Sequence, residues 1–252
     1  AFNKALTVNR QSLAGWKGLA KAHDAVGDSA ESLRCYEEVL RLDANEFEAL
    51  SNAGAILNDL KRFEEALGYH ERALQLNPSH AQTLSNQGVA LQGLGQLEAA
   101  LAAYEQALVS DPGSAEACFN KGLVYQELRQ LEKALQAYAA AIAITPDSAE
   151  AWSSKGIVLH QLGHFEEALQ DHLKSLTLNP DSAESWSNKA LTLQELGRSE
   201  EALADFQKAL ALKPDFPEVY SHQGLLLLDL RKPQDALQAC DRALALKLGY
   251  AE

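Results

Sequence analysis

The chain has 252 residues, 46% of them hydrophobic and 23% charged, and its formal net charge at pH 7 is −13. An acidic chain repels the phosphates of nucleic acids and of anionic membrane surfaces, so the charge argues against both as partners. No apolar run reaches the roughly 18 residues that a membrane-spanning helix needs, which argues against direct insertion into a bilayer. Three cysteines far apart in sequence are typical of a reducing compartment, so we expect a cytoplasmic location, while a signal or anchor outside this sequence stays open.

The sequence repeats itself with a period of 34 residues. Repeat position 8 is Gly or Ala throughout, position 20 is always small, and position 24 is aromatic or His in all but the last repeat. A single helical hairpin of this length cannot bury its own apolar face, so the repetition predicts stacked copies that bury one another's faces. Counted from Leu13, the seven repeats cover residues 13–46, 47–80, 81–114, 115–148, 149–182, 183–216 and 217–250.

In chain order, residues 1–12 come first, and we expect them to be the second helix of a truncated repeat because "AFNKALTVNR" aligns with "DFQKALALKP" of repeat 6. Each full repeat then predicts two helices. In repeat 5, apolar residues at helical spacing predict a first helix over Ala149–Leu162 that ends at Gly163, and a second over Phe165–Leu178. Residues 251–252 match the start of a further repeat, so we expect both ends to be cut from a longer chain.

The starts of four first helices carry a capping pattern, in which Asp or Ser precedes an acid or amide by three residues. Small residues at positions 8 and 20 predict a close approach of the two helices, with large residues at positions 4 and 24 filling the space beside them. The acidic first turn of the second helices suits the helix dipole. We expect the N-caps of the first helices at Ser79, Asp147, Asp181 and Asp215.

The spacing of the large, small and proline positions resembles the tetratricopeptide repeat, and the resemblance covers essentially the whole chain. It implies an all-α fold, an α-solenoid in which about seven helix pairs and a partial N-terminal one form a right-handed superhelix. First helices would line a concave face and second helices the outside. In repeat 5 the positions that carry the resemblance are Trp152, Gly156, Ala168, His172, Ser175 and Pro180.

The sequence shows no catalytic motif: G-x-S-x-G, P-loop, H-E-x-x-H and GxGxxG are all missing. Carboxylates recur from repeat to repeat, which suits helix starts better than a unique acid/base pair. His160 and His164 have a spacing that could share a zinc ion, but Gly163 ends the helix between them. His70 and His172 occupy the aromatic position 24, which predicts a packing role. We therefore expect no catalytic residues, no metal and no cofactor in this chain.

One face of the first helices carries the candidate binding residues, because positions 2, 5, 6, 9 and 13 share a face at the helical period. Position 6 is mostly asparagine, whose amide can both donate to and accept from the peptide groups of an extended ligand. Mostly acidic residues at position 2 predict a neutral or basic partner. The asparagines could equally be a family trait without a ligand, and position 9 could pack between repeats. The candidate contacts are Asn52, Asn86, Asn120, Asn188 and Ser154, flanked by Ser153 and Ser187 and by the apolar Leu123, Ile157 and Leu191.

These features predict a protein-interaction scaffold that binds a peptide or an extended segment of a partner in its concave groove. The stretches "LSNAG", "LSNQG" and "WSNKA" are also similar to repeats that precede the catalytic region of peptide O-linked N-acetylglucosamine transferases. The alternative is therefore a substrate-recognition arm of a larger enzyme such as a glycosyltransferase. The carboxylate clamp of chaperone cofactors is matched only weakly, since Lys21 and Gln82 stand where it needs other residues. Exposed terminal repeats could also drive end-to-end self-association.

Overall fold

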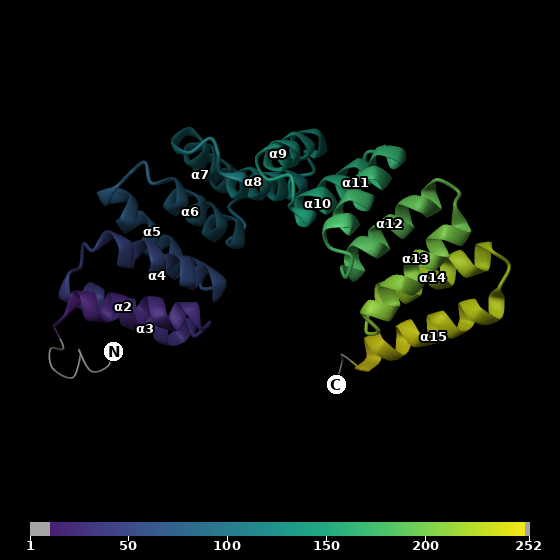
Figure 1. Ribbon diagram of the computed structural model, residues 1–252, viewed down its shortest axis with the longest axis horizontal. Helices are drawn as coiled ribbons and strands as arrows, with labels where there is room; N and C mark the ends of the chain where they lie inside the picture. The colour runs from purple at the N-terminus through teal and green to yellow at the C-terminus, as the bar shows by residue number, and fades with distance from the viewer. Residues whose placement is uncertain (1–10, 250–252) are drawn as a thin grey trace. The chain divides into compact units, whose positions relative to one another are not determined.

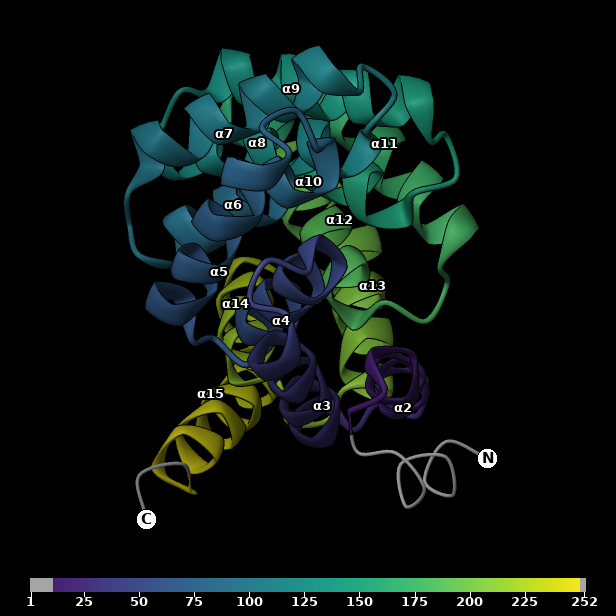
Figure 2. The same ribbon diagram turned by 90° about the vertical axis from the view of Figure 1, so that its left-hand side faces the viewer.

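The computed structural model describes residues 11–249, and this part of the chain is helical throughout, with short turns between the helices. It divides into two compact units, with the boundary between Leu128 and Arg129 in the middle of repeat 4. The helix expected in residues 1–12 lies almost wholly outside the described residues, as do residues 251–252. Figures 1 and 2 show the helices of each unit in two orientations.

The first unit contains the helices of repeats 1 to 3 and the first helix of repeat 4. Within it the two helices of each repeat pack against each other, and each second helix packs against the next first helix. The helix pairs expected from the sequence are thereby confirmed. The helices are α2 (Leu13–Ala25), α3 (Ser29–Leu42), α4 (Phe47–Asp59), α5 (Phe63–Leu76), α6 (Ala81–Gly93), α7 (Leu97–Ser110) and α8 (Ala115–Glu127).

The second unit follows the same plan, beginning with the second helix of repeat 4. Its helix pairs are joined in the same way, so that every helix packs against its neighbours in the chain. Each first helix in both units begins at the first position of its repeat. The helices are α9 (Leu131–Ile144), α10 (Ala149–Gln161), α11 (Phe165–Leu178), α12 (Ala183–Glu195), α13 (Ser199–Leu212), α14 (Pro217–Asp229) and α15 (Pro233–Gly249).

The two helices of a repeat meet where position 8 faces the ring at position 24. A Cβ atom at Gly156 would lie 2.7 Å from His172 Cε1, and one at Gly54 would lie 2.5 Å from His70 Cε1. Contacts this short cannot form without movement, so glycine is required wherever the opposing ring is seated in this way. Both imidazoles are fully buried, which confirms their packing role, and burial lowers the pKa of each to about 4.

The N-caps of the first helices lie one residue later than the sequence pattern predicts, so the expected caps at Ser79, Asp147, Asp181 and Asp215 are wrong. In repeat 5, the side chain of Ser148 accepts a hydrogen bond from the backbone N–H of Ala151 at 3.2 Å. The first helix of repeat 7 has no side-chain cap and begins instead with proline at its first turn. In repeats 5 and 6 the error arises because Asp and Ser both favour caps, and there they are neighbours.

The turn inside each repeat uses a left-handed backbone at position 15. Gly163 has φ +80°, which confirms that it ends the first helix of repeat 5. Three repeats place a larger residue in the same conformation, with φ near 57° at Lys61 and 58° at Arg129 and Arg231. A side chain with a Cβ atom is strained in this conformation, so these three turns lose some stability relative to the glycine turns.

Cys35 and Cys118 are buried, as expected of small hydrophobic residues, while Cys240 is half-buried and packs near Gly224. All three are free thiols. Over residues 11–249, no helix is both long and apolar enough to span a bilayer.

Candidate functional site

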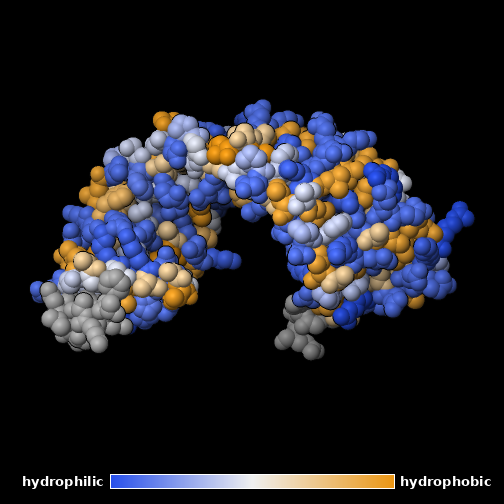
Figure 3. Space-filling view, in the orientation of Figure 1, coloured by the Kyte–Doolittle hydropathy of each residue, from blue (hydrophilic) through white to orange (hydrophobic). Residues whose placement is uncertain are grey.

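The exposed sides of the first helices form the candidate site, called here the first-helix face. In the first unit α4 contacts α6 and α6 contacts α8, and in the second unit α10 contacts α12 and α12 contacts α14. Successive first helices therefore present equivalent repeat positions side by side within each unit. Figure 3 shows that hydrophilic residues cover most of the visible surface of both units, with hydrophobic residues in scattered groups.

The first unit brings three of the candidate asparagines onto neighbouring helices. Asn52, Asn86 and Asn120 come from α4, α6 and α8, and all three are half-buried. Leu123 stands one turn further along α8 and is half-buried as well. A partly exposed row of amides with an apolar neighbour can receive both the polar and the apolar groups of a chain laid across the helices.

The second unit carries the remaining candidates on α10 and α12. Ser154 and Asn188 occupy position 6, and Ile157 and Leu191 occupy position 9, all of them half-buried. The position-9 side chains are thus not fully covered by packing between repeats and leave apolar surface on the first-helix face.

The amides differ in how far they are already bonded. Asn52 Nδ2 donates to the hydroxyl of Tyr36 at 2.9 Å, and Asn86 Oδ1 accepts from Gln82 Nε2 at 3.2 Å. The side-chain amides of Asn120 and Asn188 form no hydrogen bond within the described part of the chain. Each asparagine therefore keeps at least one free donor or acceptor for a ligand.

The serines at position 5 take part mainly in packing between successive first helices. Ser187 is only 6% exposed. Ser51 Oγ lies 2.8 Å from Thr83 Oγ1 on the next first helix, and Ser185 Oγ lies 3.5 Å from Ser153 Oγ in the same way. Ser153, which is half-buried, therefore lies at the seam with the next first helix, while the burial of Ser187 leaves little of it for a ligand to meet.

Part of the acidic column at position 2 is neutralised by lysines. Glu48 forms ion pairs with both Lys17 and Lys21, and hydrogen bonds from these two ammonium groups lower the pKa of its carboxyl group. Glu184 Oε1 lies 2.9 Å from Lys213 Nζ. Exposed Glu150 and Glu218 have no ion pair among residues 11–249. These two carboxylates therefore leave uncompensated negative charge on the first-helix face of the second unit.

The two histidines considered for zinc are engaged elsewhere. His160 Nδ1 is 3.1 Å from Thr192 Oγ1 on α12, and its ring makes an edge contact with Phe165. His164 precedes the first residue of α11 and lies 3.7 Å from Glu167. No group of three or more His, Cys, Asp or Glu side chains within residues 11–249 is placed to hold a metal ion.

The structure also shows buried ion pairs inside the repeats that the sequence analysis missed. Lys155 Nζ donates to Asp171 Oδ2 at 2.7 Å, and Lys189 forms the same pair with Asp205. Burial raises the pKa of both aspartates, although their lysine partners act in the opposite direction. The available signal was a lysine and an aspartate recurring at positions 7 and 23 of two consecutive repeats.

Comparisons with known proteins give one family. Models described as tetratricopeptide repeat match residues 45–108, 85–149, 119–183 and 183–216. No curated protein matches this chain at a significant level.

Solved structures agree with this match. A tetratricopeptide repeat protein from Parabacteroides merdae has a TM-score of 0.71 and 20% identity, covering 94% of this chain and 93% of that one. YrrB, described as a TPR protein with an unusual peptide-binding site, has a TM-score of 0.60 and 22% identity over 78% of this chain and 97% of its own. MamA from Desulfovibrio magneticus has a TM-score of 0.63 and 18% identity, covering 67% of this chain and 96% of that one. At identities of 18–22%, these similarities show that this chain shares its fold with the three proteins.

Proposed function

Because the chain belongs to the tetratricopeptide-repeat family, whose members are protein-interaction scaffolds, we propose that its first-helix face binds an extended segment of a partner protein. The observation that carries the proposal is the placement of Asn52, Asn86 and Asn120 on three successive first helices, each with hydrogen-bonding capacity left over. The peptide-binding site described for YrrB supports a ligand of the same class. Only tetratricopeptide repeats are matched in this chain, which supports binding as the proposed function.

The expected affinity is modest. Three amides that each contribute about 0.5–1.5 kcal/mol net supply about 1.5–4.5 kcal/mol. Association costs about 4–15 kcal/mol, so hydrogen bonds to the asparagines alone do not give a stable complex. Apolar contact with position-9 residues such as Leu123 must supply the rest. The natural outcome is a micromolar dissociation constant, which corresponds to a binding free energy of about −8 kcal/mol.

Charge selects the partner. The chain carries −13 overall, and Glu150 and Glu218 leave unpaired carboxylates on the first-helix face of the second unit. A neutral or basic segment is attracted to this surface, whereas an acidic one is repelled.

Alanine substitution of the asparagine row tests the proposal. The N52A/N86A/N120A variant is used to capture partners that co-purify with the unchanged protein, which are identified by mass spectrometry. The control variant Q75A/Q106A/Q136A removes three exposed amides from second helices. We expect the first variant to lose the captured proteins and the control to retain them, with equal helical circular dichroism. Equal recovery by both variants would reject the first-helix face as the binding surface.

A second candidate function is substrate selection within a larger enzyme such as a glycosyltransferase. The row of asparagines favours it, because the first unit presents three consecutive amides that could hold a substrate chain in an extended form. Under this proposal the captured proteins are substrates, and they carry a sugar modification that can be detected by mass spectrometry. If the captured partners carry no sugar modification, substrate selection is rejected and the scaffold function is the one that remains.

Self-association and location complete the proposal. Leu225 on α14 and Leu244 on α15 are 58% and 60% exposed and line a cavity of about 300 Å³, which suits contact with a second copy. The L225E/L244E variant should then have a smaller mass by light scattering than the unchanged protein at high concentration. Equal masses would contradict self-association. The three free thiols support a cytoplasmic location, which cell fractionation tests.

A further inference from the structure

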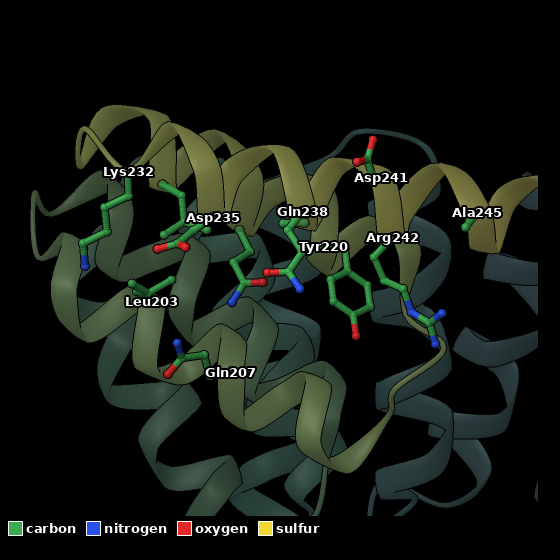
Figure 4. A pocket seen from close by; sticks show the side chains of 12 residues that line it. Leu203, Gln207, Tyr220, Lys232, Asp235, Gln238, Asp241, Arg242 and Ala245 are labelled. Carbon is green, nitrogen blue, oxygen red and sulfur yellow. The ribbon is translucent and has the colours of Figure 1, made fainter.

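An open cavity lies between α13, the second helix of repeat 6, and the two helices of repeat 7, α14 and α15. Its volume is about 720 Å³. We call it the repeat-7 cavity, and Figure 4 shows its lining side chains. The residues that the argument uses are Gln207, Tyr220, Gln223, Asp235, Gln238 and Ala239.

The equivalent space in the two preceding repeats is filled from within the chain by a lysine. In repeat 6, Lys189 Nζ lies 3.0 Å from Asp205 Oδ2 and 4.8 Å from the centre of the Trp186 ring. In repeat 5, Lys155 has the same partners, with its Nζ atom 2.7 Å from Asp171 Oδ2 and 5.3 Å from the indole ring at position 4. The ammonium group thus lies between an aromatic face and a buried carboxylate, an arrangement that favours a cation.

Repeat 7 keeps the aromatic ring and loses both charged partners. Position 4 is Tyr220, position 7 is Gln223 in place of lysine, and position 23 is Ala239 in place of aspartate. The two losses occur together, which avoids a buried charge without a partner. Because glutamine and alanine are together smaller than lysine and aspartate, the space beside the ring is left open.

The groups that remain around this space are suited to a cation. Gln207, Gln223 and Gln238 each present an amide, and none of these side chains has a hydrogen bond to another described residue. Gln223 is only 8% exposed and is part of the cavity lining. Asp235 supplies a carboxylate that has no ion pair among the described residues. Figure 4 shows the chain's own cations, Lys232 and Arg242, at opposite ends of the cavity, with Asp235 and Gln238 between them.

We propose that the repeat-7 cavity binds a basic side chain, lysine or arginine, of a partner peptide, which takes the place that Lys155 and Lys189 occupy in the preceding repeats. The cationic group would lie against the Tyr220 ring, with its hydrogens donated to the amide oxygens and to Asp235. The volume accommodates the side chain together with the adjoining peptide backbone. This site is built from α13, α14 and α15, and its α14 residues Tyr220 and Gln223 occupy positions 4 and 7, which are not among the candidate positions of the first-helix face.

Nuclear magnetic resonance with short peptides tests the site directly. The probe is the tripeptide acetyl-Gly-Lys-Gly-amide, with acetyl-Gly-Arg-Gly-amide as a second basic probe and acetyl-Gly-norleucine-Gly-amide as the uncharged control. The observed signals are the side-chain amides of Gln207, Gln223 and Gln238. We expect saturable shifts with at least one basic probe and no saturation with the norleucine peptide. Equal shifts with all three probes would overturn the proposal.

Two variants separate this site from general attraction to an acidic surface. The Q223K/A239D variant restores the internal pair of repeats 5 and 6 and should weaken binding of the basic probe at least tenfold. Asp235→Asn, which removes one exposed charge, should weaken it severalfold, whereas Asp229→Asn outside the cavity should not. Melting curves confirm that each variant is folded. Unchanged binding by either folded cavity variant would overturn the proposal.

Discussion

The contact between position 8 and position 24 can be tested with one methyl group. In Gly156→Ala, the new Cβ atom would lie 2.7 Å from His172 Cε1, about 1 Å closer than carbon atoms approach without repulsion. Inserting a group into a packed core in this way costs about 1–3 kcal/mol. The same change raises helix propensity, because alanine is favoured over glycine by about 1 kcal/mol inside a helix.

Gly68→Ala supplies the matched control. Gly68 also lies inside a helix, but a Cβ atom there would meet nothing within 4 Å. The control should therefore be more stable than the parent by about 1 kcal/mol, from propensity alone. Because both variants share the propensity gain, the difference between their free energies of unfolding isolates the steric cost. We expect Gly156→Ala to be less stable than Gly68→Ala by about 1–3 kcal/mol.

Urea unfolding followed by circular dichroism measures both free energies. A second comparison uses His172→Ala, which removes the opposing ring. In that background the steric cost of Gly156→Ala should disappear, which gives a coupling energy between the two sites. If Gly156→Ala stabilises the chain as much as Gly68→Ala does, the helix register described here is wrong.

Three further predictions concern turns, protonation and caps. Lys61→Gly should raise the melting temperature, gaining about 0.5–1 kcal/mol because φ of 57° strains any residue with a Cβ atom; no gain would mean that the turn is relaxed. His172 has a pKa near 4 in the folded chain and about 6.5 when unfolded, so the unfolded chain binds more protons between these values and stability falls as pH drops through this window. His172→Tyr should flatten that pH dependence, and an unchanged urea midpoint profile would contradict it. Ser148→Ala should cost about 0.5–2 kcal/mol of unfolding free energy and Asp147→Ala less, whereas the reverse order would restore the earlier cap assignment.

The candidate site was predicted in outline but not in its bonding. Helical periodicity alone places position 6 on one face of the first helices, where its residues are half-buried, while their contact with a ligand stays a prediction. That Asn52 is bonded to Tyr36 could not be foreseen, since it depends on a distance between two different repeats. The burial of Ser187 likewise follows from how closely successive first helices approach.

The sequence by itself determined the period, the helix pairs and the residues that face each other inside a repeat. A 34-residue unit with glycine at position 8 and a ring at position 24 can bury its apolar side only by pairing its two helices closely. The tertiary structure decided which polar groups remain free. Gln207 and Gln223 line a cavity because three helices leave space between them, and that space depends on packing between repeats that no local pattern encodes.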